Sequence, residues 1–268
     1  MIVRPVLGVL ERETLKLLRE RGRLVSAMAR PLLWLLVIGA GFAATRGAGA
    51  AEYQSFLVPG VIGMTLLFGA VLAALATVYD KESGVMRMLV IAPVAHHWIV
   101  LAKALGAAAV AILQALMLLA LLALLGYVST ELSIPLLAVG LIGTAFTCAS
   151  LGMLIAAWSR TLENYATLMN FVIFPVFFLS GSLYPVQMLP DALRLAAAVN
   201  PFTYGVDLLK HAAIAGPSAA FDPDFSAVLD LAVLAGFSAA ALFIASLRFS
   251  RETAYEPLVH RLAGRRGE

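Results

Sequence analysis

The chain has 268 residues, of which 62% are hydrophobic and only 13% are charged. A soluble protein of ordinary composition is about 45–50% apolar and ~25% charged, so this chain holds more apolar residues than one water-soluble core can bury. Several apolar runs exceed about 18 residues, which predicts membrane-spanning helices. The formal charge of +3 comes with basic residues that flank these runs, which favours a membrane protein over a nucleic-acid-binding one. We predict an all-α integral membrane protein with a single domain over residues 1–268.

The N-terminal residues 2–23 have the pattern of an amphipathic helix. Apolar residues such as Val3, Leu7 and Leu10 fall on one face, and most charged residues lie elsewhere around it. Such a helix favours the membrane–water interface, and the alternative is a helix that packs on its own protein. The first membrane span is predicted at about 24–45.

Five further apolar runs bring the predicted number of transmembrane helices to six. They cover residues 56–79, 99–127, 134–158, 165–184 and 225–247. The link at 185–224 lacks an apolar run long enough to cross a bilayer. It is predicted to hold two short helices, at 189–199 and 202–214, which are re-entrant or interfacial because of their length.

The basic residues predict the orientation of the chain. If both termini face the cytoplasm, only three of the 19 Lys and Arg residues lie outside, namely Arg46, Arg194 and Lys210. This distribution matches the excess of positive charge that cytoplasmic loops carry. It predicts a multi-pass protein with both ends in the cytoplasm, and it places the loop at 80–98 on the same side.

Several kinds of chemistry are absent from the sequence. No lysine precedes a Ser or Thr, so there is no Walker A phosphate loop, and there is no His-Glu-x-x-His or Gly-x-Ser-x-Gly. His96 and His97 are adjacent, which suits interfacial side chains better than a metal pair, and Cys148 suits a packing role. Spans two to five carry no Asp or Glu, which disfavours a transporter driven by protons or sodium. We predict no catalytic residue, metal or cofactor in this chain.

Three stretches of the chain resemble the permease subunits of ABC-2 type ATP-binding cassette transporters. They are Leu57-Val58-Pro59-Gly60, the segment 79–94 with its Asp-Lys-Glu-Ser-Gly and Ala-Pro-Val motifs, and the segment 175–202 with its Leu-Ser-Gly-Ser-Leu-Tyr-Pro motif. The chain is most similar to the group of bacterial drug, nodulation-factor and polysaccharide exporters. The order and spacing of the motifs, together with six spans, extend the resemblance over nearly the whole chain.

The resemblance implies a partnership and a direction of transport. Two permease copies pair, with a homodimer expected, and each copy docks a separate cassette ATPase that binds ATP and Mg. The complex would lie in the bacterial cytoplasmic (inner) membrane, with no nucleic-acid partner. It would move an amphiphilic, lipid-linked, drug-like or glycan substrate outward across the lipid bilayer.

The loop at 80–98 resembles the coupling helix that contacts the ATPase in this family. The candidate coupling residues are Asp80, Lys81, Glu82, Ser83, Gly84, Val85, Met86, Arg87 and Leu89. On a helix, Glu82, Val85, Met86 and Leu89 share one face, which is the pattern of a helix that binds a groove. The alternative is an ordinary solvated loop.

The resemblance also implies that the link after span five dips back into the membrane from the outer side. Gly181 and Pro185 suit the bend that such a path needs. Candidate residues for a substrate path or gate are Asn170, Phe174, Phe177, Phe178 and Tyr184. The alternative for the aromatic residues is packing against helices or lipid, and for Asn170 it is a hydrogen bond between helices.

Two other classes of function stay open at this point. One is a secondary transporter or channel that needs no ATPase. The other is a membrane enzyme, although the sequence contains no recognisable set of nucleophile, base or metal ligands.

Overall fold

The computed structural model describes residues 29, 31–37, 50–84, 96–128, 132–213 and 222–264. Within these ranges the chain forms helices and turns and includes no strand, which confirms the all-α class for this part of the protein. The predicted interfacial helix at 2–23 and most of the first predicted span at 24–45 lie outside the described residues. The number of six spans therefore stays a prediction.

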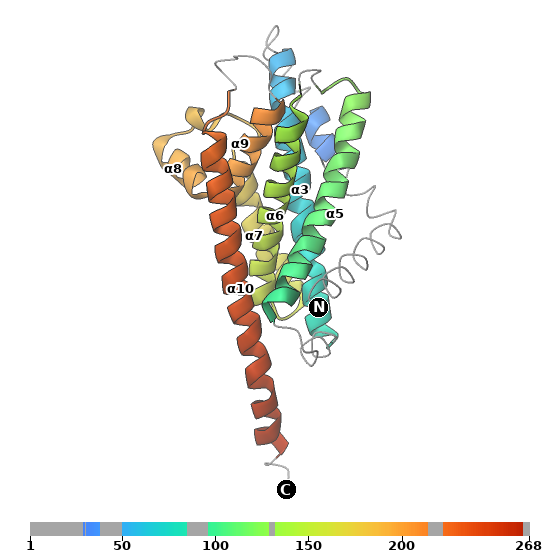
Figure 1. Ribbon diagram of the computed structural model, residues 1–268, viewed down its shortest axis with the longest axis vertical. Helices are drawn as coiled ribbons and strands as arrows, with labels where there is room; N and C mark the ends of the chain where they lie inside the picture. The colour runs from blue at the N-terminus through green and yellow to red at the C-terminus, as the bar shows by residue number, and fades with distance from the viewer. Residues whose placement is uncertain are drawn as a thin grey trace.

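The described bundle contains seven α-helices and one 3-10 helix, together with a short helical segment at 31–37 that holds Trp34 (Figure 1). In chain order the seven α-helices and the 3-10 helix are α3 (Ala50–Glu82), α5 (His96–Leu124), α6 (Ile134–Trp158), α7 (Leu162–Phe178), η2 (Val186–Met188), α8 (Asp191–Val199), α9 (Pro201–Ala213) and α10 (Ala227–Gly264). Among the residues that the structure describes, four segments are long and apolar enough to cross a membrane. They are Phe56–Glu82, His97–Leu124, Ile134–Trp158 and Ala227–Ser250.

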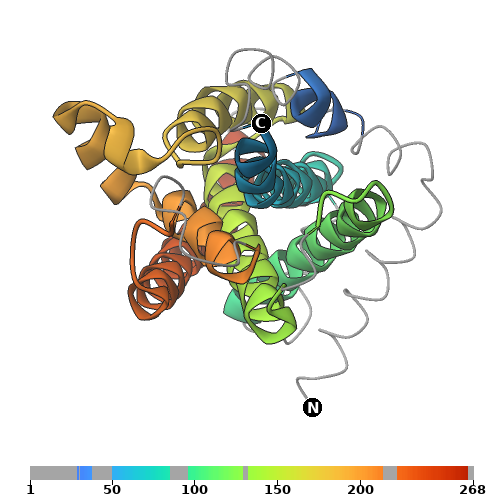
Figure 2. The same cartoon turned by 90° about the horizontal axis from the view of Figure 1, so that it is seen from above.

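Helix α3 lies in the middle of the bundle. It contacts α5, α6, α7 and α9, and Figure 2 shows it surrounded by these elements. Phe56, Leu66 and Leu67 of α3 are fully buried, so the apolar run seen in the sequence supplies the core and not only a lipid-facing surface. Pro59, expected in the first turn, lies inside the helix because α3 begins at Ala50.

The two ends of the bundle have different architectures. We call the base the end where α3 and α6 finish and where α5 and α7 begin. We call the top the opposite end, which holds α8, α9 and the start of α10 (Figure 1). At the base, α3 continues to Glu82 instead of ending at 79, and Gly84 then takes a left-handed φ of 76° that breaks the helix.

Helix α7 is shorter than the predicted span at 165–184. The Thr161 side chain caps its start by accepting a hydrogen bond from the Asn164 amide. The helix has 17 residues, ends at Phe178 and is followed by a turn in which Gly181 has a φ of 73°. Only Gly adopts this conformation without strain, so the turn stops the helix before the apolar run ends.

The link after α7 folds into short helices, as predicted. The expected helices at 189–199 and 202–214 correspond to α8 and α9, which begin immediately after Pro190 and Asn200. Their depth in a membrane stays a prediction. Helix α10 continues to Gly264, beyond the predicted end of span six at 247, and its last turns extend past the base of the bundle (Figure 1).

Candidate functional site

A buried ion pair joins α3 and α5 at the base of the bundle. Nζ of Lys103 lies 2.5 Å from Oδ2 of Asp80, and both side chains are about nineteen-twentieths buried. Because a desolvated charge without its partner is very unfavourable, the two residues are needed together. The pair therefore ties the last turn of α3 to the beginning of α5.

The neighbouring residue Lys81 binds the end of α6. Its Nζ donates to the carbonyl oxygens of Ala156, at 3.0 Å, and Ser159, at 3.3 Å. These carbonyls belong to the last turn of a helix, where the backbone dipole favours a cation. The same ammonium lies 4.3 Å from the centre of the Phe249 ring on α10. Lys81 thus bridges α3, α6 and α10.

Glu82 completes this arrangement by binding the start of α7. Its Oε2 accepts a hydrogen bond of 3.1 Å from the backbone amide of Leu162. The first amides of a helix have no partner inside the helix, and a carboxylate there is also favoured by the helix dipole. Consecutive residues of α3 are therefore bonded to α5, α6 and α7.

The predicted coupling residues lie in different environments in the structure. Asp80 is 3% exposed because Lys103 holds it inside the bundle, so its carboxylate does not face a partner protein. Lys81 bonds within the bundle, whereas Glu82 and Ser83 are exposed. Gly84 forms the turn after α3. The remaining candidates, Val85, Met86, Arg87 and Leu89, lie outside the described residues.

Three of the predicted gate residues contact one another on α7: the Phe178 ring stacks on Phe174, with ring centres 6.4 Å apart, and packs edge-to-face on Phe177 at 5.7 Å. Phe177 is buried in the core and packs edge-to-face on Trp34, with ring centres 5.9 Å apart. Phe174, by contrast, is 49% exposed, and Phe178 and Asn170 are also exposed on α7. Tyr184 donates a hydrogen bond to the carbonyl of Phe178. Phe177 therefore has the packing role that was the alternative, while the outer face of α7 remains available to lipid or to another subunit.

The predicted bend at Gly181 and Pro185 lies where the chain turns back at the end of α7. The hydroxyl groups of Ser180 and Ser182 lie 2.5 Å apart on either side of Gly181, and Pro185 precedes η2. Asn200 then fixes the start of α9 by donating to the carbonyl of Val176, at 2.7 Å, and accepting from the Phe202 amide. These bonds join the link to the end of α7.

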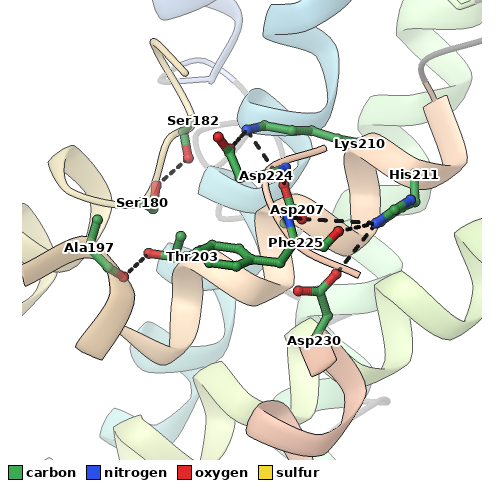
Figure 3. A network of polar contacts seen from close by, with 10 residues as sticks. All are labelled: Ser180, Ser182, Ala197, Thr203, Asp207, Lys210, His211, Asp224, Phe225 and Asp230. Carbon is green, nitrogen blue, oxygen red and sulfur yellow. Dashed lines mark hydrogen bonds and ion pairs between the residues drawn. The ribbon is translucent and has the colours of Figure 1, made fainter. Parts of the chain in front are cut away.

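A second polar cluster lies at the top of the bundle, between α9 and the start of α10 (Figure 3). Its members, called the top cluster here, are Asp207, Lys210, His211, Asp224 and Asp230. Lys210 Nζ lies 2.9 Å from Asp224 Oδ2 and 3.8 Å from Asp207 Oδ1. His211 Nε2 is 3.8 Å from Asp230 Oδ2. The sequence does not predict this grouping, although the spacing of Asp207, Lys210 and His211 places these three residues on one side of a helix.

Asp207 is the residue that connects the members of the top cluster. Its carboxylate accepts hydrogen bonds from the amides of Asp224, at 2.7 Å, and Phe225, at 2.8 Å. Burial raises the pKa of Asp207, while these hydrogen bonds and the charge of Lys210 act in the opposite direction. The carboxylate thus holds the segment before α10 against α9.

Comparison with known proteins shows a match to one family over most of the chain. The family profile described as ABC-2 type transporter matches residues 6–213. Nodulation protein J from Rhizobium leguminosarum bv. trifolii is 28% identical over 200 residues, which cover 72% of this chain and 75% of that protein. A putative transport permease, ycf38, from Pyropia yezoensis is 27% identical over 217 residues, covering 78% and 74% of the two chains. Nodulation protein J from Rhizobium meliloti (strain 1021) is 28% identical over 223 residues, covering 80% and 83%.

Proposed function

This chain belongs to the ABC-2 type transporter family, and from that membership we propose that it is the transmembrane permease subunit of an ATP-driven exporter. A separate cassette ATPase would bind ATP and Mg, and the permease would act as a homodimer. The cargo would be amphiphilic, lipid-linked, drug-like or a glycan, moved outward across the bacterial cytoplasmic membrane. The names of its relatives, a nodulation protein and a putative transport permease, support the transport part of this proposal.

One observation carries the proposal: the last turn of α3 is bonded to three other helices at the base. Asp80, Lys81 and Glu82 contact α5, α6 and α7 respectively. A force applied to the segment after Glu82 would therefore act on several helices at once. This is the arrangement that a permease needs if its energy source is a separate cytoplasmic protein.

The proposed cycle uses this connection in the following way. ATP binding closes the two ATPase subunits, and the segments at 85–95 of the two permeases move with them. Each α3 transmits this movement to α5, α6 and α7 through the bonds at its end. The paired bundles then open toward the outside and release the substrate. This chain forms no covalent bond with the cargo.

The test uses two charge or polarity changes in the coupling segment. The permease would be coexpressed with a candidate cassette ATPase from the same organism, and copurification, ATP hydrolysis and efflux from vesicles would be measured for Glu82→Lys and Met86→Asp. Loss of a charge pair at an interface costs about 2–5 kcal/mol, so we expect roughly 30-fold or greater weakening of docking in Glu82→Lys. Matched controls on the outer side are Asp191→Lys and Met188→Asp, since both residues are exposed on the link after α7.

The controls make the result interpretable. Both should copurify with the ATPase and export substrate normally, because a cytoplasmic partner cannot reach them. Normal assembly and efflux in both coupling variants would contradict the coupling assignment. Efflux that persists without any ATPase would favour the secondary transporter instead.

A further inference from the structure

We propose that Asp207, His211 and Asp230 form a binding site for a divalent metal ion of the zinc or manganese type. The site belongs to the top cluster and joins α9 to α10 (Figure 3). It goes beyond the proposed function, and its test needs neither the ATPase nor transport.

The donor atoms of the three residues converge on one point. His211 Nε2 lies 3.9 Å from Asp207 Oδ2 and 3.8 Å from Asp230 Oδ2, and all three donor atoms lie within 4.8 Å of one another. In a tetrahedral zinc site with bonds of 2.0–2.1 Å the donors are about 3.3 Å apart. The two distances from His211 would therefore shorten by roughly 0.5 Å, and the two carboxylate oxygens, which lie within 4.8 Å of each other, would approach by up to about 1.5 Å. One imidazole and two carboxylates form a donor set that suits zinc and manganese.

Asp230 supplies a second and independent observation. The residue is fully buried, and neither oxygen of its carboxylate has a hydrogen-bond partner in the described part of the chain. Figure 3 shows this carboxylate pointing toward His211. A buried carboxylate without a partner is strongly unfavourable unless a cation or a proton balances it. The missing partner lies on the side where Asp207 and His211 present their donor atoms.

The top cluster has more negatively charged than positively charged side chains, so an additional cation would be favourable there. Lys210 pairs with Asp224, at 2.9 Å, and faces Oδ1 of Asp207, so the only lysine of the cluster lies on the side away from His211. Oδ2 of Asp207 faces His211 instead. The cluster has three carboxylates and one ammonium, and a divalent ion between Asp207 and Asp230 would offset the remaining negative charge.

The surroundings of His211 complete the site. Its side chain is 25% exposed, whereas those of Asp207 and Asp230 are almost fully buried, so an ion can enter along the imidazole. Nε2 lies 2.9 Å from the carbonyl oxygen of Phe225, which would be a fourth donor, and the third oxygen, close to the ion. The metal would bind the neutral imidazole that carries its proton on Nδ1, so a proton on Nε2 goes to solvent from the imidazolium form, or exchanges to Nδ1 in the neutral form.

The direct test measures metal binding by the full chain. The protein would be purified in detergent, stripped with EDTA, and titrated separately with Zn²⁺ and Mn²⁺ by calorimetry, with metal content measured after desalting. We expect about one ion per chain for at least one of the two metals, and roughly tenfold or greater loss of affinity in Asp230→Asn and His211→Gln. The matched controls Asp191→Asn and His97→Gln change exposed residues of the same types outside the site and should bind like the parent protein.

A second measurement on the unmodified chain covers the case in which the variants do not fold. Diethyl pyrocarbonate should modify the exposed edge of His211, and the bound metal should protect this residue, as read by peptide mass spectrometry. Absence of binding for both ions, equal binding by Asp230→Asn, or absence of protection at His211 would overturn the proposal. In that case a proton on Asp230 would be the balancing charge.

Discussion

Lys103 and Asp80 are 23 residues apart in the chain, yet they form one ion pair at 2.5 Å inside the base of the bundle. Helix α3 ends at the base and α5 begins there, and the segment between the two helices contains the candidate coupling residues. The pair therefore closes the loop that carries these residues. A force on the loop would therefore reach the last turn of α3, which holds Asp80, and the early turns of α5, where Lys103 is the eighth residue of the helix.

The first prediction concerns this pair. Lys103→Met leaves the Asp80 carboxylate buried without its cation, which should lower the free energy of unfolding by about 3–5 kcal/mol. The double variant Asp80→Leu/Lys103→Met removes both charges and should recover most of the loss. Thermal unfolding in detergent would measure both effects. Equal melting temperatures for the single and double variants would show that the pair contributes little.

The second prediction concerns the contact between α3 and the turn after α7. A methyl group on Gly60 would overlap the backbone carbonyl of Ser182, which cannot rotate away as a side chain can. Gly60→Ala should destabilise the protein by about 1–3 kcal/mol. The matched control is Gly236→Ala on α10, where nothing lies within 4 Å and a neutral or slightly stabilising effect is expected. A stable Gly60→Ala variant would mean that the turn can move away from α3.

The third prediction concerns the anchoring of α7. The Tyr165 hydroxyl is buried and donates a hydrogen bond of 2.6 Å to the carbonyl of Val71 on α3. Tyr165→Phe keeps the ring and removes this bond, so it should cost about 1 kcal/mol in unfolding free energy. Tyr184→Phe removes an exposed hydroxyl that water can replace and should cost less. The melting temperatures of the two variants would show whether Tyr165→Phe destabilises the protein more than Tyr184→Phe does.

The fourth prediction concerns topology. Cys148 is the only cysteine in the chain and is buried, so Cys148→Ala gives a background without reactive thiols. A cysteine introduced at Ser218 should react with a membrane-impermeant maleimide in intact cells. A cysteine at Ser83 should react only after the membrane is opened. External labelling of the Ser83 variant would reverse the predicted orientation.

The sequence predicted best the helices that have a proline at their start or polar residues immediately after their end. The span predicted at 134–158 coincides with α6, because Pro135 begins the helix and the polar residues after Trp158 end it. Prolines at 190 and 201 placed α8 and α9 within two residues of their observed starts. Hydropathy indicates the apolar part of α10, Ala227–Ser250, but not where the helix ends, because α10 continues as a helix into charged sequence up to Gly264.

Contacts between side chains on different helices could not be predicted in the same way. Asp80 looked like a surface residue because its neighbours are charged, and nothing in the spacing shows that Lys103 meets it. The top cluster was missed for a related reason: Asp207 and Asp230 lie on separate helices joined by a link, so only packing brings them to His211. The spacing of residues within one helix predicts a shared face, but the neighbour of that face depends on the fold.

The central position of α3 has a mechanical consequence. Gly60 touches the turn near the top, and Glu82 lies at the base, so the same helix is held at two distant points. At a rise of 1.5 Å per residue, about 33 Å of helix separate them, and a tilt of ~5° would displace one point by about 3 Å relative to the other. A small rotation of α3 at one end of the bundle would therefore displace the residues at its other end by about the diameter of an atom.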